Sequence, residues 1–330
     1  MATPLILDVD TGVDDLVALL YAVASPEVEL IGATTVMGNT HVEKVTRNTL
    51  LVLEIGGAGH VEVAGGASRP LSQDWEPFPV VHGVEGLGGF APREPAATAS
   101  SRDAATLIVE EARRRPGEIL LVSTGPLTNI ALALRMEPRL PELLAGYALM
   151  GGAFREGGNV TPRAEANVWM DPDAAACVFD AWSGAAPAQL PMCLGLDVTE
   201  RVWLSEADLG AICAPASDSE LARLLRESVG FYADFYASTG RYEGACMHDP
   251  LAVAAAIDQT VCTWTDTRVE VEVEGRWTRG ETVTDLLAIR TSPWSDWARE
   301  ENARVATSVD ARAVVARMVE RLRALVEARA

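Results

Sequence analysis

Short apolar runs alternate with segments of helical periodicity along the first half of the chain. Residues 5–7 form an apolar run of strand length, and the apolar positions from Leu16 to Val23 keep helical spacing. The same order recurs, so we expect strands at 28–37, 61–64, 119–123 and 147–150, and helices at 41–55, 102–115 and 128–137. Repeated β-α units predict an α/β fold with an open, mainly parallel, doubly wound (Rossmann-like) sheet flanked by helices.

The second half shows the same pattern less regularly. We expect strands at 190–193, 269–274, 282–289 and 304–308, and helices from 172, at 220–238, at 251–258 and at 311–330. The segment 68–95 is rich in glycine and proline and has no period, which is typical of functional or disordered loops. Because the chain shows no repeat, linker or change of composition, we expect one domain over residues 1–330.

Four carboxylates crowd the first strand-turn-helix unit: Asp8, Asp10, Asp14 and Asp15. Two like charges about 5 Å apart repel by roughly 3 kcal/mol at an effective dielectric constant of about 20. A helix N-terminus offsets part of this repulsion, and a bound cation would turn it into affinity. Oxygen ligands alone suit a hard ion such as Ca²⁺ or Mg²⁺. The simpler interpretation is that Asp14 or Asp15 only caps the helix.

Bulk properties exclude several classes of partner. The net charge of −20 argues against nucleic acid and against an anionic membrane surface. No apolar run approaches the length of a membrane span, and the first residues carry no basic region typical of a signal peptide. The five cysteines are scattered and show no metal or disulfide spacing, so we expect a cytoplasmic protein.

Five segments together resemble the inosine-uridine nucleoside hydrolases. The segment DVDTGVDDLVAL at 8–19 is similar to the D-T-D-P-G-x-D-D signature, with Val9 and Thr11 in place of Thr and Pro. The other four segments are HGVEGLGG at 82–89, GPLTNIA at 125–131, the stretch from MGG at 150–152 to AEAN at 164–167, and HDP at 248–250. The resemblance covers roughly residues 5–258. It implies the nucleoside hydrolase fold, hydrolysis of ribonucleosides to free base and ribose, a Ca²⁺ cofactor, and a homodimer or homotetramer.

The resemblance also implies roles for individual residues. The metal would be held by Asp10, Asp15, the carbonyl of Thr124 and Asp249. Asp10 would also act as general base on the attacking water, and His248 as general acid for the departing base, since its ordinary pKa suits proton transfer near neutrality. Asp8 would orient a metal ligand. Asp249 precedes a proline at the start of a predicted helix, so capping is a compatible second role.

The substrate-binding residues follow from the same resemblance. The ribose would be bound by Asp14, Asn39, Met150, Asn159, Glu165 and Asn167, and the base would lie near His82, Tyr232 and Tyr236. Taken singly, Asn39 is equally well a turn residue and the tyrosines core aromatics. Ala166 stands where the family has an aromatic residue, which removes a packing surface against the sugar. We favour packing rather than base stacking for Trp75.

Two other functions are compatible with part of the pattern. The stretch from Asp8 to Thr11 also contains the D-x-D-x-T pattern of haloacid-dehalogenase-like phosphatases, whose lysine would have to be Lys44, the only lysine. A non-catalytic calcium-binding protein is the second alternative, although an EF-hand loop beginning at Asp8 would place Leu19 at its twelfth position. Neither alternative accounts for the later polar segments.

Overall fold

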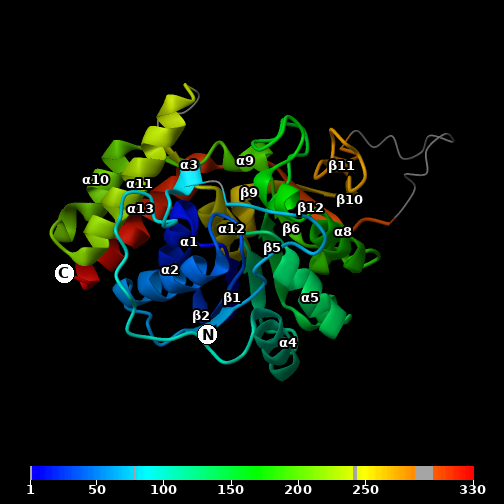
Figure 1. The fold of residues 1–330 in the computed structure, drawn as a ribbon, viewed down its shortest axis with the longest axis horizontal. Coiled ribbons are helices and arrows are strands. Elements are labelled where there is room, and N and C mark those ends of the chain that lie inside the picture. The colour runs from blue at the N-terminus through cyan, green and yellow to red at the C-terminus, as the bar shows by residue number, and fades with distance from the viewer. Residues whose placement is uncertain (1, 78, 241–243, 287–299) are drawn as a thin grey trace.

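A mainly parallel sheet forms the centre of the computed structural model, which describes residues 2–77, 79–240, 244–286 and 300–330 (Figure 1). Its strand order is β3-β2-β1-β4-β5-β6-β12-β9, and only β9 runs antiparallel to its neighbour. The eight strands are β1 (Thr3–Val9), β2 (Val28–Thr35), β3 (Glu62–Gly65), β4 (Leu120–Ser123), β5 (Gly146–Met150), β6 (Met192–Leu194), β9 (Cys262–Thr267) and β12 (Ala303–Val309). This confirms the predicted fold class.

Helices cover both faces of the sheet because its strands alternate their apolar side chains between two cores. On β1, Leu5 and Leu7 belong to one core and Ile6 to the other. The first core contains α1 (Val13–Val23), α2 (Val42–Ile55), α11 (Glu220–Ser238), α12 (His248–Ile257) and α13 (Ala311–Ala328). The second core contains α4 (Ala104–Arg114), α5 (Thr128–Met136) and α8 (Pro172–Ala181) (Figure 1).

Shorter elements connect these layers. The short helices are α3 (Pro79–His82), α6 (Leu140–Leu143), α7 (Ala166–Met170), α9 (Leu196–Thr199) and α10 (Glu206–Cys213). Two small antiparallel pairs join β7 (Trp203–Leu204) to β8 (Ala245–Cys246) and β10 (Val269–Val271) to β11 (Thr282–Thr284). Single 3₁₀ turns lie at Pro187–Gln189, Ala214–Ala216 and Gln259–Val261.

Most predicted elements are present, with shifted ends. The helix predicted at 220–238 has these bounds in α11, and β10 pairs with β11 as expected, although residues 287–289 of the predicted partner strand lie outside the described residues. The segment between β5 and α8, for which no element is predicted, contains the short helix α7, and Glu165 caps its first turn. The segment 68–95 contains the short helix α3.

The strand order reverses direction beside β1. The chain proceeds from β1 to β2 and β3 on one side, and then returns to β4, β5 and β6 on the other side of β1. In open α/β sheets, ligands bind outside the carboxyl ends of strands at such a switch point. Asp10 directly follows β1 and Thr124 directly follows β4. The topology therefore brings both to the expected ligand site.

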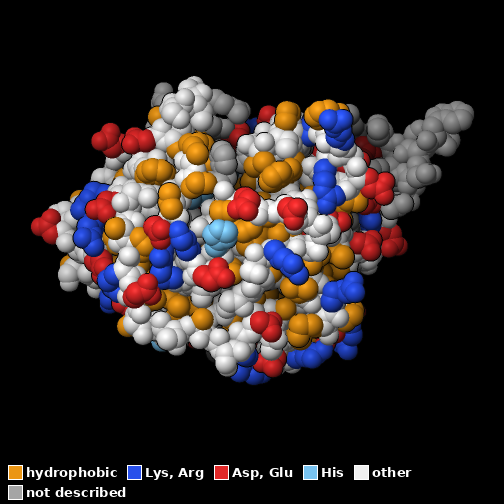
Figure 2. Space-filling view, in the orientation of Figure 1, with side chains coloured by type: hydrophobic (Ala, Val, Ile, Leu, Met, Phe, Trp, Pro, Cys, Tyr) orange, Lys and Arg blue, Asp and Glu red, His pale blue; other side chains and the backbone are white. Residues whose placement is uncertain are grey.

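The surface carries charge of both signs. Acidic and basic side chains are interspersed on the face drawn in Figure 2, although acids outnumber bases over the whole chain by 47 to 27. Among the helices of the described residues, none combines the length and apolar character that a membrane crossing requires.

Candidate active site

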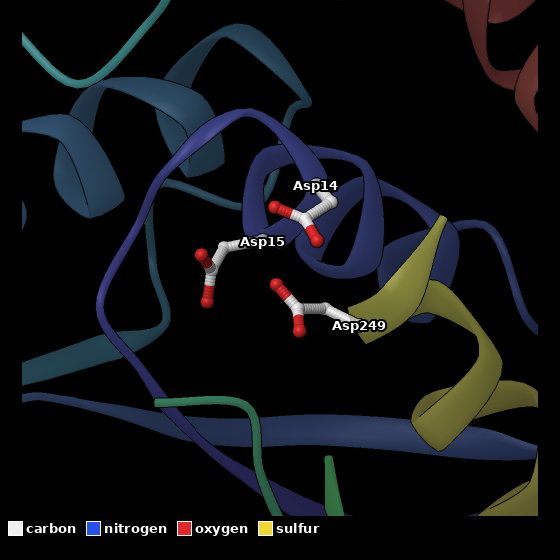
Figure 3. A group of neighbouring side chains, drawn as sticks. All are labelled: Asp14, Asp15 and Asp249. Atoms are coloured by element: carbon white, nitrogen blue, oxygen red, sulfur yellow. The ribbon is translucent and has the colours of Figure 1, made fainter. Parts of the chain in front are cut away.

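Three buried carboxylates converge at the point where α1 and α12 meet. Asp14 and Asp15 come from the first turn of α1, Asp249 comes from the first turn of α12, and all three side chains point toward one another (Figure 3). Oxygen atoms of the three groups lie within 4.8 Å of one another. Asp14 and Asp249 thus belong to one acidic group although they lie 235 positions apart in the chain. This group brings together the motifs at 8–19 and 248–250.

Asp10 lies beside this group and is held by backbone donors. The backbone N–H of Asn39 donates to its Oδ2 at 2.8 Å, and a Cβ at Gly38 would overlap the same carboxylate, so glycine is required there. The other oxygen, Oδ1, is buried and has no hydrogen-bond partner among the residues that the structure describes. A buried carboxylate oxygen without a donor is costly, so this atom indicates a missing ligand.

Burial, and to a smaller extent mutual repulsion, raises the pKa of these acids. Burial raises the pKa of Asp14 to about 8, and the charge of Asp15 adds to the effect. Burial also raises the pKa of Asp10 and Asp249 well above the ordinary range, with contributions from the neighbouring carboxylates. The protein has therefore concentrated negative charge where water cannot solvate it, and only a cation or protons can neutralise it.

Hydrogen bonds orient Asp15 toward the group. Its Oδ1 accepts from the Thr124 hydroxyl at 2.7 Å, and its Oδ2 accepts from the Gly12 N–H at 2.9 Å and the Asn39 side chain at 3.2 Å. The carbonyl of Thr124 accepts from Asn167 Nδ2 at 2.8 Å. Carboxylates and a backbone carbonyl are the oxygen ligands that hard cations prefer.

The polar segment between β5 and α7 closes another side of the site. Asn167 Nδ2 also donates to the Met150 carbonyl at 3.1 Å, and this links the end of β5 to the end of β4. The Glu165 carboxylate caps α7 by accepting from three backbone N–H groups, those of Gly152, Asn167 and Val168. Asn159 is exposed, and its side chain accepts from the backbone of Ala166, which is half-buried.

The loop at 82–89 places His82 beside the N-terminus of α1. His82 Nδ1 accepts a hydrogen bond from the Val13 N–H at 3.1 Å and lies 4.0 Å from Asp14 Oδ1. Burial lowers the pKa of His82 to about 3, with a smaller effect of His248. The imidazole is therefore neutral, with Nδ1 as acceptor and Nε2 carrying the proton. Its ring lies 5.1 Å from that of Tyr232.

A buried histidine and two tyrosines lie on the same side of the acidic group as His82. His248 Nδ1 lies 2.8 Å from the Thr199 hydroxyl, and its Nε2 lies 2.6 Å from the Tyr236 hydroxyl. The hydroxyls of Tyr232 and Tyr236 are 3.3 Å apart. Burial lowers the pKa of His248 to about 4. Both ring nitrogens have hydrogen-bond partners. His248 therefore acts on a ligand through Tyr236, or contacts it directly after the Tyr236 side chain moves.

Two further residues support the site from a distance. The Asp8 Oδ1 accepts from Thr34 at 2.6 Å and from Asn129 at 2.7 Å, whereas its Oδ2 is buried without a partner, and burial raises the pKa of Asp8 to about 7. Trp75 packs with its ring edge-on to His41, at 5.5 Å between centroids.

Sequence reasoning missed Thr199 and Asp197, both in the short helix α9. Asp197 accepts from the backbone N–H groups of Phe154, Arg155 and Glu156 and so ties α9 to the loop after β5. Neither residue lies in a recognisable motif. Only the three-dimensional contacts identify them.

Lys44, the lysine that a phosphatase would need, forms its contacts with the loop at 82–89. Lys44 Nζ donates to the Val84 carbonyl at 2.9 Å and pairs with Glu85 at 2.8 Å, which fixes the loop that carries His82. The phosphatase alternative therefore gains no support from the described residues, and the histidine and amide groups around the acids go beyond the needs of a structural calcium site.

Comparisons with known proteins agree with this site. The family described as "Inosine-uridine preferring nucleoside hydrolase" matches residues 5–316. The chain is 39% identical to "Inosine-uridine preferring nucleoside hydrolase" of Crithidia fasciculata over 87% of this chain and 89% of that protein. It is 34% identical to "Probable uridine nucleosidase 2" of Arabidopsis thaliana over 96% of this chain and 97% of that protein.

A solved structure supports the same assignment. The "Purine-Preferring Ribonucleoside Hydrolase from Gardnerella vaginalis" superposes with a TM-score of 0.89 at 34% identity, covering 98% of this chain and 99% of the other. The matches in sequence and structure extend over most of the chain, and the family match spans the residues of every motif of the site. The chain therefore belongs to the inosine-uridine preferring nucleoside hydrolase family and is a nucleoside hydrolase, an enzyme that cleaves the N-glycosidic bond of ribonucleosides.

Proposed function

We propose that this enzyme releases free base and ribose with calcium as its cofactor and Asp10 as general base. The observation that carries the proposal is the convergence of Asp14, Asp15 and Asp249 beside Asp10, whose Oδ1 is buried without a partner. The donors are all oxygen atoms, which fits Ca²⁺ better than a softer ion. Asp10, Asp15, the Thr124 carbonyl and Asp249 would hold the ion. When bound, it would lower the pKa of a water and attract the ribose diol.

Asp10 is suited to accept the proton of the attacking water. Its Oδ2 is fixed by the Asn39 N–H, so Oδ1 remains as the atom that can take a proton. Hydrolysis adds the water oxygen to C1′ as the bond to the base breaks, through an oxocarbenium-like transition state. General base catalysis contributes typically about 10²- to 10⁴-fold to the rate.

The remaining polar groups are suited to hold the ribose and to stabilise positive charge. Asp14 and Glu165 are buried carboxylates, and Asn39 and Asn167 supply amides from two sides of the acidic group. Asn159 and Met150 complete the ribose side, with Asn159 fixing the backbone of Ala166. Asp8 acts indirectly, because its contacts go to Thr34 and Asn129.

His248, Tyr236, Tyr232 and His82 are proposed to serve the departing base. They contact one another, and they supply ring faces and hydroxyls rather than charges. His248 would donate a proton or a hydrogen bond to the base through Tyr236, since its Nε2 faces this hydroxyl at 2.6 Å.

Replacing Asp10 tests the assignment of the base. We expect Asp10→Ala to lose turnover by about 10²-fold or more while its circular dichroism spectrum stays that of the wild type. The matched control is Asp74→Ala, which removes an exposed carboxylate from the loop before α3. Near-normal turnover by folded Asp10→Ala would exclude this role.

The preferred base is left open, because similar proteins are named for different bases: uridine, inosine and uridine, or purines. Release of base from inosine, adenosine, uridine and cytidine would rank the substrates directly.

Three further expectations remain proposals. We propose that residues 1–330 act as one domain, which the family match over 5–316 supports. We propose a homodimer or homotetramer, which light scattering of the purified protein would test. We also propose a cytoplasmic location, in line with the scattered spacing of the five cysteines in the sequence.

A further inference from the structure

The hairpin of β10 and β11, outside the main sheet, contacts the start of the loop that leads to Glu165. This loop spans residues 153–164 between β5 and α7. The Thr282 hydroxyl accepts a hydrogen bond from the Ala153 N–H at 2.9 Å and donates to the Ala153 carbonyl at 3.0 Å. An N–H only donates and a carbonyl only accepts, so both roles of the hydroxyl are fixed. Thr282 and Ala153 are buried, which shields both bonds from water.

The same hairpin also contacts the end of the loop. Ala164 forms an antiparallel bridge with Glu281, and Arg163 pairs with the Glu281 carboxylate. Gly280 has a φ of +83°, and a Cβ there would come within 2.9 Å of the Trp169 Cα and 3.2 Å of the Ala164 Cβ. Glycine is therefore required for this close approach. Three consecutive hairpin residues, 280–282, thus hold both ends of the loop.

The first of these contacts adjoins a donor to the Glu165 carboxylate. The Gly152 N–H donates to Glu165 Oε2 at 3.0 Å, and Gly152 directly precedes Ala153. Gly152 has a φ of +89°, and a Cβ there would lie 3.1 Å from the Thr282 hydroxyl oxygen. A displacement of Ala153 therefore moves Gly152 and shifts the N–H that Glu165 accepts.

The rest of the segment is held by other elements. Asp197 accepts from the N–H groups of the next three residues, 154–156. The Leu196 N–H donates to the Gly152 carbonyl at 2.9 Å. Loss of the Thr282 hydroxyl would therefore displace the segment locally rather than release the loop. The expected effect is on the geometry of binding.

We propose that Thr282 is a positioning residue for the ribose, because it holds Ala153 and Gly152 so that the Glu165 carboxylate keeps its place. The inference deepens the proposed function, since it rests on Glu165 as a ribose ligand. A side chain that is already fixed by its surroundings binds a substrate hydroxyl with a smaller loss of conformational freedom. The hairpin thereby contributes to substrate binding through the loop.

Two substitutions separate the hydroxyl from the shape of this side chain. Thr282→Val keeps the branched shape and removes both hydrogen bonds, whereas Thr282→Ser keeps the hydroxyl. The matched control is Thr284→Val, on the same strand, where the hydroxyl donates to the Arg268 carbonyl at 2.8 Å rather than to the loop. If Thr282→Val does not fold, Thr282→Ala replaces it, because the smaller side chain leaves room for a water at the two backbone groups.

Steady-state kinetics with inosine and uridine, in the presence of calcium, give the first readout. We expect Thr282→Val to raise KM by roughly 10-fold and to change kcat by no more than about 3-fold. Thr282→Ser and Thr284→Val should keep KM within about 2-fold of the wild type. An unchanged KM in folded Thr282→Val, or an equal rise in Thr284→Val, overturns the role of Thr282.

A double-mutant cycle tests whether the effect passes through Glu165. In the background of Glu165→Ala, adding Thr282→Val should lower kcat/KM by less than about 3-fold, because the group that Thr282 positions is already absent. A loss as large as in the wild-type background would show that Thr282 acts on binding by another route and would overturn the inference.

Hydrogen exchange separates this inference from the proposed function. Mass spectrometry of peptides that cover residues 151–158 should show faster exchange in Thr282→Val than in the wild type and in Thr284→Val. Exchange that stays at the wild-type rate overturns the contact as a restraint on the loop. If the wild type releases no ribose from any nucleoside, the proposed function fails, and the exchange experiment still decides whether Thr282 holds the loop.

Discussion

At the scale of single residues, the role of a side chain in the site depends more on the groups around it than on its residue type. Asp10 and Asp8 are both buried acids of the same segment with one orphaned oxygen each. Asp8 faces Thr34 and Asn129, whereas Asp10 lies beside Asp15 and receives the Asn39 N–H. Their different surroundings support an indirect role for Asp8 and a direct role for Asp10.

Ala166 carries the first prediction at this scale. It is the half-buried first residue of α7, between Glu165 and Asn167, where the resembling family has an aromatic residue. We expect Ala166→Phe to lower KM for nucleosides by roughly 5-fold, because an added ring contributes about 1 kcal/mol of packing against the sugar. Steady-state kinetics on the best substrate measure this effect.

A polar replacement is the control for this substitution. Ala166→Ser adds an atom without a ring, so its KM should stay close to that of the wild type. A KM for Ala166→Phe that is unchanged or higher than that of the wild type would show that the sugar does not lie against this position.

The motif residues could be predicted at this scale, and the supporting residues could not. Asp10, Asp15 and Asp249 lie in segments that match the sequence pattern of the family. In the structure these residues lie close to one another. Thr199 is a single threonine in no motif, and its importance arises only because the fold brings it to His248, 49 positions away. From one sequence, a single threonine outside any motif cannot be recognised as part of a site.

At the scale of elements, α9 connects the two sides of the site although it spans only Leu196–Thr199. Asp197 anchors the loop at 154–156, which lies between β5 and α7, and Thr199 contacts His248. Short helices of this kind have too few residues for a periodic pattern, which explains why α9 was not predicted.

The second prediction concerns this anchor. Asp197→Ala leaves three backbone N–H groups without their carboxylate partner, so we expect the free energy of unfolding to fall by about 2 kcal/mol. Urea unfolding followed by circular dichroism measures the change. The matched control, Asp218→Ala, removes an exposed carboxylate and should stay within about 0.5 kcal/mol of the wild type. Equal stability of the two variants would show that the anchor contributes nothing.

Strand β9 shows a different limit of prediction from the sequence. Its residues, Cys262–Thr267, are largely polar and partly exposed, because the strand lies at the edge of the sheet. An edge strand needs no continuous apolar run, so its pattern resembles that of a loop. The buried parallel strands β1, β2, β4 and β5 were predicted because both of their faces are covered.

At the scale of the whole molecule, the topology creates the acidic site. Because the order of strands reverses beside β1, the ends of β1 and β4 face the same space, and α12 brings Asp249 there from the last part of the chain. Alternating elements predicted the sheet and the edge where ligands bind, but not the order of its strands. The position of β12 between β6 and β9 depends on long-range packing that no local pattern records.

The third prediction belongs to this scale. Under the proposed function, calcium would bind only the folded arrangement of these carboxylates, so at a calcium concentration of 100 times Kd it should stabilise the protein by about 2.7 kcal/mol. We expect Tm to rise by about 5 °C on adding calcium and to return on adding a chelator. Differential scanning calorimetry measures the shift.

Asp249→Asn is the informative variant for this experiment. The pKa of Asp249 is raised by burial and by the charges of Asp14, Asp15 and Asp10, so its ionised form destabilises the calcium-free protein. Without calcium, the variant should therefore be at least as stable as the wild type at pH 8, and with calcium it should lose most of the shift in Tm. A full calcium shift in Asp249→Asn would remove Asp249 from the proposed ligands.

The central claim is that a metal held by these carboxylates enables the cleavage of nucleosides. The most direct measurement is the release of free ribose from inosine and uridine by calcium-loaded enzyme, by enzyme treated with a chelator, and by treated enzyme to which calcium is returned. We predict release in the first sample, loss in the second and recovery in the third. Release that continues unchanged in the presence of the chelator would contradict the account.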